Sequence, residues 1–298
     1  MTNSIDLEGW VSNSKDDSEE EFRKAVKCLL EGISKEASLA SLMVMKGGLL
    51  LSIKYNSPRY TKDIDFSTQK PLADLDFEEL LQSFQKGIEG AEENEYGLAF
   101  RLQKHEVKPA PKNNPSFPSL HLKIGYANRS HVNSYNQLKR NQSPKIVAID
   151  FSFNEWIKDD DAETVEIDNA GTLKLYSFYE ILAEKIRSLL QQPIRRRERY
   201  QDVYDVHRLL SESPPSEEKC LEVLNHLRAA CKARDVPLSQ LSFDDPAIKD
   251  LARKGYEEQL RDQLPEEPPE FEEAFAVVEA FFKSLPWDEE NAVQEAKE

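Results

Sequence analysis

The chain has 298 residues, of which 39% are hydrophobic and 32% are charged, and its formal net charge is −16. This length suits one large domain or two modest ones, and the apolar share excludes a disordered chain. A protein with this excess of acidic groups repels polyanions, which excludes tight non-specific binding to DNA.

The sequence gives no sign of an export or membrane signal. It opens on polar and acidic residues, so a signal peptide is not expected. No apolar stretch approaches the length that crosses a bilayer, so we expect no membrane partner. The three cysteines are scattered and odd in number (Cys28, Cys220 and Cys231). This pattern argues against a disulfide framework and favours a cytoplasmic location.

The first elements are predicted to be helices. Residues 1–17 are polar and are expected to form a disordered tail. Ser18 and Glu21 resemble a capping box, and an apolar stripe at helical spacing follows them (Phe22, Val26, Leu29, Leu30 and Ile33). An apolar run at residues 39–45 then leads into Gly47-Gly48 and a brief helix that ends before Pro58.

Strands are predicted next, at residues 64–67, 97–107, 120–126 and 145–153. A Pro- and Asn-rich loop at 109–118 separates the second from the third. The last strand alternates most clearly: Val147, Ile149 and Phe151 face one way, while Asp150 lies on the other face.

After Gly171 the pattern becomes helical, with helices predicted at residues 176–192, 198–210, 217–232, 246–264 and 270–285. We therefore predict an α+β fold. A mixed sheet with flanking helices occupies residues 18–171, an α-helical C-terminal domain occupies 172–286, and an acidic tail occupies 287–298.

Asp63 and Asp65 are the first candidate site residues. Side chains at i and i+2 of a strand share one face, so both carboxylates point the same way while Ile64 and Phe66 enter the core. Two like charges this close are costly unless a cation lies between them, and Mg²⁺ prefers a few carboxylates together with phosphate oxygens. The alternative is a solvated strand edge, which is common for a bare Asp-x-Asp.

The second candidate is the pair Gly47-Gly48, fifteen residues before Asp63. Adjacent glycines let backbone N–H groups approach a phosphate, and a helix start favours negative charge. The alternative is a plain turn. Asp150 is the third candidate, because a neighbouring strand could bring it beside Asp63 and Asp65 to complete a two-metal type of site. Its alternative is an ordinary surface aspartate.

The residues from Lys46 to Gly48 and from Arg59 to Phe66 resemble the first motif of the AbiEii/AbiGii nucleotidyltransferase toxins, within the DNA polymerase β-like nucleotidyltransferase superfamily. The segment 184–189 resembles the family's lysine-bearing helix, and 199–206 resembles its Arg-x-x-Asp-x-Tyr-Asp-Leu motif. Together these motifs cover about forty positions within residues 20–285. The sequence departs from the pattern at Leu49-Leu50 (usually Thr-Ala), at Thr61 (usually Ser) and at Gln192 (often Arg).

The resemblance implies a nucleotidyltransferase-type sheet and a set of site residues. Asp63, Asp65 and Asp150 would hold Mg²⁺ or Mn²⁺, with Asp150 completing the metal site or activating the attacking hydroxyl. The nucleotide would be bound by Lys46, Gly47, Gly48, Arg59 and Lys185, and the catalytic set would add Lys185 and Asp202 to the three carboxylates.

Several of these roles have open alternatives. Lys185 could be a solvent-facing helix lysine. Asp202 and Asp205 share a helix face and could orient Lys185 or Arg187, act as a base, or be surface acids. Arg59 could contact phosphate or brace the loop before Asp63. The five histidines show no metal-ligand spacing and are interpreted as structural or surface residues.

The implied activity is transfer of NMP from an NTP, with release of pyrophosphate, by the toxin of a toxin–antitoxin or phage-defence system. The acceptor would be a tRNA 3′ end or a protein, and a cognate antitoxin would be the partner. The alternatives are a non-catalytic nucleotide- or partner-binding module, which the loss of threonine after Gly48 favours, and a small-molecule (antibiotic) nucleotidyltransferase. The basic run Arg195–Arg199 favours a polyanionic acceptor, although a charge run is usually a solvated face.

Overall fold

The computed structural model describes residues 4–109, 116–158, 162–167 and 170–287. The chain divides into two units, which we name the sheet unit (Met1–Ser57 and Thr61–Tyr176) and the helical unit (Pro58–Tyr60 and Ser177–Glu298). The three residues 58–60 thus belong with the helical unit, although both flanking segments belong to the sheet unit.

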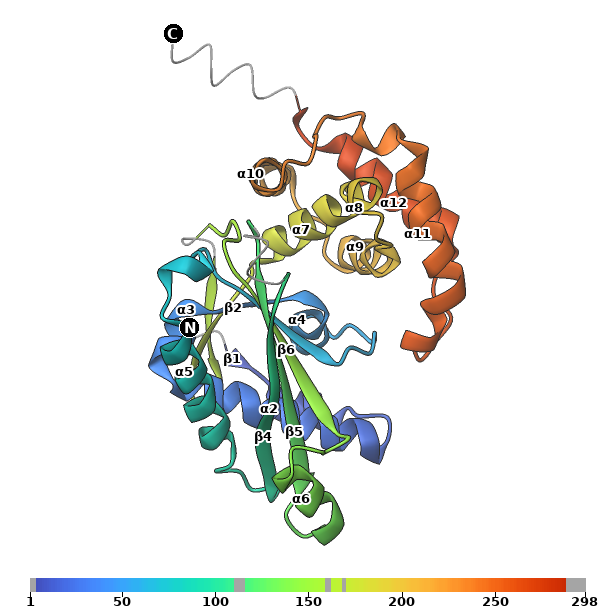
Figure 1. The fold of residues 1–298 in the computed structure, drawn as a ribbon. Coiled ribbons are helices and arrows are strands. Elements are labelled where there is room, and N and C mark those ends of the chain that lie inside the picture. Colours follow the sequence, from blue (N-terminus) through green and yellow to red (C-terminus); the bar gives the residue numbers. More distant parts are fainter. Residues whose placement is uncertain (1–3, 110–115, 159–161, 168–169, 288–298) are drawn as a thin grey trace. The chain divides into compact units, whose positions relative to one another are not determined.

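A mixed eight-stranded sheet with the order β1-β7-β8-β2-β3-β6-β5-β4 forms the sheet unit (Figure 1). Its strands are β1 (Ser4–Ile5), β2 (Val44–Lys46), β3 (Asp63–Ser67), β4 (Leu98–Lys108), β5 (Ser119–Asn128), β6 (Ile146–Ser152), β7 (Glu163–Ile167) and β8 (Gly171–Leu175). Strand β3 runs parallel to β6 and antiparallel to β2, and β6 runs antiparallel to β5.

The helices of this unit include α1 (Leu7–Ser12), α2 (Asp17–Lys35), α3 (Ala37–Leu42), α4 (Gly47–Lys54), α5 (Phe77–Ala91), α6 (Val132–Lys139) and the 3₁₀ turn η1 (Leu72–Asp74). The apolar face of the sheet packs under α5, where the Phe84 and Phe151 rings meet edge to face at 6.1 Å. Helices α2 and α5 approach each other closely at Gly32. A Cβ on this residue would lie only 2.1 Å from the Gly87 carbonyl oxygen, so the close approach requires glycine. The opposite face of β3 and β6 carries the candidate acids.

The helical unit contains α7 (Phe178–Leu190), α8 (Gln192–Arg195), α9 (Tyr200–Glu212), α10 (Glu217–Ala233), α11 (Pro246–Gln259) and α12 (Phe271–Ser284), with the 3₁₀ turns η3 (Ser242–Asp244) and η4 (Arg261–Gln263). A capping box of Ser177 and Glu180 fixes the start of α7. Part of the core is aromatic, with the Phe243 ring 4.6 Å from that of Phe282 and 5.8 Å from that of Phe275.

The α+β class and the strands predicted on both sides of the Pro-rich loop are confirmed, and part of that loop (110–115) lies outside the described residues. The expected N-terminal tail is wrong in part, because residues 4–12 form β1 and α1. The predicted capping box at Ser18 is also wrong, because Asp16 caps α2 by accepting a hydrogen bond from the Glu19 N–H.

Strands β7 and β8 and helix α5 were not predicted, and the two units divide after Tyr176 rather than near residue 171. The acidic tail expected at 287–298 lies outside the described residues except for Trp287. Within the described ranges, no helix is both long enough and apolar enough to cross a membrane.

Candidate active site

Asp65 and Asp150 are direct cross-strand partners on the neighbouring parallel strands β3 and β6. Partners in register point to the same side of a sheet, and Asp63 joins them because it lies two residues before Asp65. Ile64 and Phe66 are fully buried on the opposite face. The sheet therefore gathers the three predicted carboxylates on one face, from segments about 85 residues apart in the sequence.

The carboxylates influence one another electrostatically. Burial raises the pKa of Asp63, and the negative charge of Asp150 raises it further, while His121 and Lys62 act in the opposite direction. A carboxyl with a raised pKa holds its charge at a cost that a nearby cation would relieve. The site thus has the charge imbalance that favours cation binding.

Gly47 is the first residue of α4 and lies directly against Asp65. Its φ is +79°, in the left-handed region, and a Cβ built on it would lie only 2.1 Å from Asp65 Oδ2. Only glycine leaves room there for the carboxylate. The N–H groups of the first helical turn have no partners within the helix and favour an anion. The start of α4 and the carboxylate face are therefore adjacent parts of one site.

The residues on either side of the glycine pair are both buried. Lys46 is opposite Asp65 in the register of β2 and β3, and its Nζ lies 3.9 Å from Glu155 Oε1 and 5.6 Å from the centre of the Tyr176 ring. Leu49 packs in the core with 1% of its surface exposed. Binding of a phosphate at this turn would accordingly use backbone N–H groups, since the side chain that replaces the family's threonine points inward.

His121 is a member of the site that sequence reasoning missed. It is the cross-strand partner of Asp150 on β5, and its Nδ1 lies 2.6 Å from Asp150 Oδ1. Its Nε2 lies 2.9 Å from Ser119 Oγ. The alternation of strand 120–126 places His121 on the polar face, but only the pairing of β5 with β6 shows that this face carries Asp150.

A second charged cluster lies inside the helical unit. Lys185 Nζ donates to Asp202 Oδ1 at 2.9 Å and to Asp205 Oδ2 at 2.7 Å. Burial opposes the charge of Lys185, but the two carboxylates outweigh it and raise the pKa of the ammonium. The alternatives of a solvent-facing lysine and of surface acids are therefore excluded, because all three side chains are buried.

Arg59 belongs to this second cluster. Its Nε and Nη2 donate to the two oxygens of Asp205 at 3.0 and 2.9 Å, and its Nη1 donates to Gln263 Oε1 at 3.4 Å. Burial alone would raise the pKa of Asp205, but the charges and hydrogen bonds of Arg59 and Lys185 lower it to about 2. This geometry supports the role of a brace for Arg59 over that of a phosphate contact.

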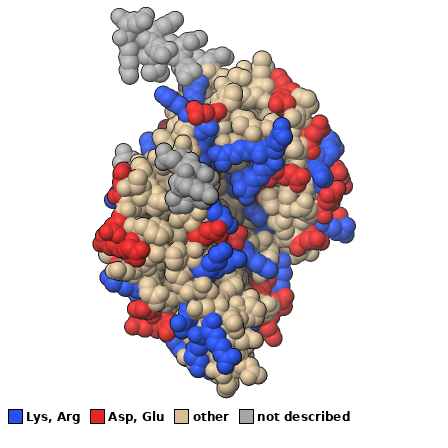
Figure 2. Space-filling model, in the orientation of Figure 1, with Lys and Arg blue, Asp and Glu red and all other residues tan. Residues whose placement is uncertain are grey.

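Gln192 occupies the position where the family often has arginine. Its side chain forms hydrogen bonds to backbone groups. The amide donates to the carbonyl oxygens of Leu189 and Ile248, and its oxygen accepts from the Arg199 N–H at 2.7 Å. Gln192 thus stabilises the turn that carries the basic run. Arg195, Arg196 and Arg197 are exposed. On the face that Figure 2 shows, lysine and arginine side chains lie in several groups, with acidic side chains between them.

The carboxylate face suits a divalent ion in the chemistry of its donors, although a complete cage is not preformed. Among the described residues, no group of three or more His, Cys, Asp or Glu side chains is arranged to hold a metal ion. Mg²⁺ is commonly bound by one or two carboxylates together with substrate phosphates and water. Asp65 and Asp150, with Asp63 beside them, meet that smaller requirement.

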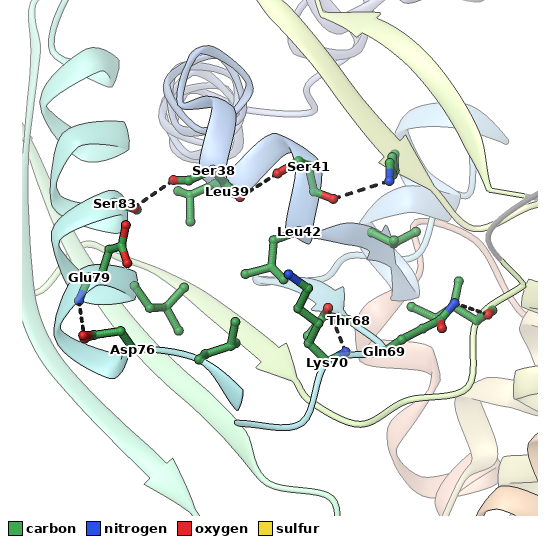
Figure 3. Close-up of a pocket in the computed structure, with 15 residues that line it drawn as sticks. Ser38, Leu39, Ser41, Leu42, Thr68, Gln69, Lys70, Asp76, Glu79 and Ser83 are labelled. Carbon is green, nitrogen blue, oxygen red and sulfur yellow. Dashed lines mark hydrogen bonds between the residues drawn. The ribbon is translucent and has the colours of Figure 1, made fainter. Parts of the chain in front are cut away.

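A cavity of about 580 Å³ lies beyond the end of β3, between α3, α5 and the residues that follow the strand (Figure 3). Thr68, Gln69 and Lys70 form one wall, and a hydrogen bond of 2.8 Å from Ser38 to Ser83 spans α3 and α5. None of the predicted site residues is among the described residues that line it. The cavity is therefore separate from the carboxylate face.

Comparison with known proteins decides the family. A sequence model described as "Nucleotidyl transferase AbiEii toxin, Type IV TA system" matches residues 28–277. The chain belongs to the AbiEii nucleotidyltransferase toxin family. A search of curated protein sequences finds no match.

Two solved structures are similar to this AbiEii-family protein. JHP933 from Helicobacter pylori is 17% identical, with coverage of 91% of this chain and 95% of that chain and a TM-score of 0.48. A protein described as a candidate nucleotidyltransferase from H. pylori is also 17% identical, with coverage of 89% and 94% and a TM-score of 0.49.

Family membership confirms the predicted enzyme class, and the protein is a nucleotidyltransferase. The same membership implies an NTP substrate and an antitoxin partner.

Proposed function

We propose that this AbiEii-family enzyme transfers an NMP group from an NTP to an acceptor hydroxyl, with release of pyrophosphate, and that the reaction depends on Mg²⁺ or Mn²⁺. The observation that supports this most directly is the register of Asp65 with Asp150, with Asp63 on the same face and Gly47 against Asp65. A metal ion held by these carboxylates would neutralise negative charge on the nucleotide phosphates.

In this reaction, separate groups of the chain bind the phosphates, hold the cation and accept the proton. The N–H groups at the start of α4, beginning with Gly47 and Gly48, bind the phosphates. Asp63 and Asp65 hold the cation, and Asp150 completes that site or accepts the proton of the acceptor hydroxyl. The hydroxyl oxygen forms a bond to the α-phosphorus as the bond to the pyrophosphate oxygen breaks.

The roles of Lys185 and Asp202 rest on the family resemblance. Lys185 would offset charge on the nucleotide, and its hydrogen bonds to Asp202 and Asp205 support a role for these two carboxylates in orienting the ammonium. We further propose that the protein is the toxin of a toxin–antitoxin pair in phage defence, with a tRNA 3′ end or a protein as acceptor. The exposed arginines 195–197 favour the RNA.

One assay tests the reaction and the acceptor together. The protein is incubated with Mg²⁺, each α-labelled NTP in turn, and a mixture of total tRNA and cell protein, beside an Asp63→Ala variant. Label transferred to tRNA or to protein by the parent alone is the expected result. Nucleotide binding without transfer to any acceptor would instead support a binding module. Equal transfer by Asp63→Ala would overturn the assignment of the carboxylates.

A further inference from the structure

Asp150 has a dedicated hydrogen-bond partner on the strand next to its own. The register Asp65, Asp150, His121 runs across β3, β6 and β5 in one row of the sheet. The imidazole Nδ1 lies 2.6 Å from Asp150 Oδ1, and the two side chains are 29% and 34% exposed. The contact is therefore short and partly shielded from water, which makes it stronger than a fully solvated one.

The far side of the imidazole is also held. Ser119 lies two residues before His121 on the same face of β5, and its Oγ is 2.9 Å from Nε2 and 3.4 Å from the Lys108 carbonyl oxygen. In the tautomer that carries its proton on Nδ1, the ring donates to Asp150 and the Ser119 hydroxyl donates to Nε2. Both ring nitrogens therefore have a partner on this face of the sheet.

The hydrogen bond from His121 uses only one of the two carboxylate oxygens of Asp150. Oδ1 accepts from His121, and no other hydrogen bond or ion pair to Asp150 is present among the described residues. Oδ2 thus remains for a cation or for the acceptor hydroxyl. A carboxylate that is tied at one oxygen loses rotational freedom about its side-chain torsions, and outer-shell ties of this kind raise metal affinity.

We propose that His121 is a positioning residue of the nucleotidyltransferase site, which fixes Asp150 through Nδ1–H and is itself fixed by Ser119. The proposal rests on the proposed function, because it assigns to Asp150 the metal or the attacking hydroxyl. His121 acts through Asp150 and needs no contact with the nucleotide.

The test compares two substitutions of similar size and polarity. The amide nitrogen of His121→Asn falls close to the position of Nδ1, so this variant keeps a donor for Asp150. The amide of His121→Gln falls close to Nε2, so this variant keeps a partner for Ser119 and loses the donor to Asp150. His131→Gln is the matched control, because His131 is an exposed residue at the start of α6 in the same unit.

Mn²⁺ affinity is measured by electron paramagnetic resonance with a non-hydrolysable α,β-methylene NTP, and label transfer is measured in parallel. His121→Gln is expected to bind Mn²⁺ about 10-fold or more weakly, since loss of an outer-shell partner costs about 10–100-fold. Its transfer rate should recover as the Mn²⁺ concentration rises. His121→Asn and His131→Gln should stay within about threefold of the parent.

The outcomes separate this proposal from the proposed function. Parent-like Mn²⁺ affinity and rate in His121→Gln, with weak binding in Asp65→Ala, would overturn the positioning role alone. Equal losses in Asn and Gln variants that keep the parent's melting temperature would also overturn it. Equal Mn²⁺ binding by the parent and Asp65→Ala would overturn the metal site and the positioning role together.

Discussion

Arg59 and Asp205, which are 146 positions apart in the sequence, form a bidentate ion pair. The same carboxylate accepts a hydrogen bond from Lys185 at 2.7 Å, so one buried aspartate serves two cations. Asp205 is 1% exposed, which leaves no water to replace a lost partner. Asp205 therefore helps to attach the segment 58–60 to the helical unit, together with Gln263, which accepts hydrogen bonds from Arg59 and from the Tyr60 N–H.

Asp205→Asn is expected to destabilise the protein by about 3–5 kcal/mol, because removal of one member of a buried ion pair leaves uncompensated charge. Urea denaturation measures the effect. Asp250→Asn, an exposed aspartate on α11, is the control and should lie within about 0.5 kcal/mol of the parent. A loss for Asp205→Asn as small as that of the control would show that the pair contributes little.

The lowered pKa of Asp205 predicts an acid-sensitive component of stability. Its pKa is about 2 in the folded protein and about 3.9 in an unfolded chain, so the folded state favours the ionised form. The resulting stabilisation of about 2–3 kcal/mol is complete above about pH 4 and is lost as the pH falls toward 2. Urea denaturation of the parent and of Asp205→Asn between pH 2 and pH 6 should show curves that converge at the acid end. Parallel curves would contradict the assignment.

Gly47→Ala should impair the site more than it impairs the fold. A matched control is Gly97→Ala, because Gly97 also has a positive φ (+68°) but its Cβ would lie 3.9 Å from the nearest atom, in Asn128. Both variants carry the backbone strain of a left-handed residue, about 1–2 kcal/mol. Only Gly47→Ala displaces the Asp65 carboxylate. We expect transfer to fall by about 100-fold or more in Gly47→Ala and by less than threefold in Gly97→Ala. Equal activity in the two variants would show that the contact with Asp65 is unimportant.

Mg²⁺ should stabilise the parent protein through the carboxylate face. Binding adds about 2.7 kcal/mol at a concentration 100 times the Kd. In the absence of metal, Asp63→Asn should be more stable than the parent at neutral pH, because a raised pKa makes the ionised carboxyl unfavourable above that pKa. The same variant should gain less from Mg²⁺. Thermal denaturation with and without Mg²⁺ measures both effects, and Asp74→Asn on η1 is the control. An equal Mg²⁺ response in Asp63→Asn and the parent would remove Asp63 from the metal site.

Local patterning predicts most of what lies within one element. The alternation around Val147, Ile149 and Phe151 predicts β6 and places Asp150 on the opposite face, as the structure shows. The Asp-x-Asp spacing likewise predicts that Asp63 and Asp65 share a face. These inferences succeed because side-chain direction in a strand follows from the period of two.

Local sequence patterns do not predict which strands pair or in which register. The pairing of β5 with β6, which brings His121 to Asp150, depends on a register that only the folded sheet fixes. The burial of Lys185 was missed for a similar reason. A lysine on an amphipathic helix is usually solvent-facing, and its two carboxylate partners come from the next long helix. Most of strand β8 lies within the region that is predicted to be helical. Its five residues end only a few positions before α7 begins.

We expect Asp63, Asp65 and Asp150 to act together in metal-dependent transfer. The measurement that tests it most directly is the rate of label transfer from an α-labelled NTP in Mg²⁺ by Asp63→Ala, Asp65→Ala, Asp150→Ala and the control Asp74→Ala. We expect each site variant to lose about 10²–10³-fold in rate. The double variant of Asp65 and Asp150 should be little slower than either single one, because residues that act as a unit are not additive. Retention of the parent's rate by any of the three site variants would contradict the account.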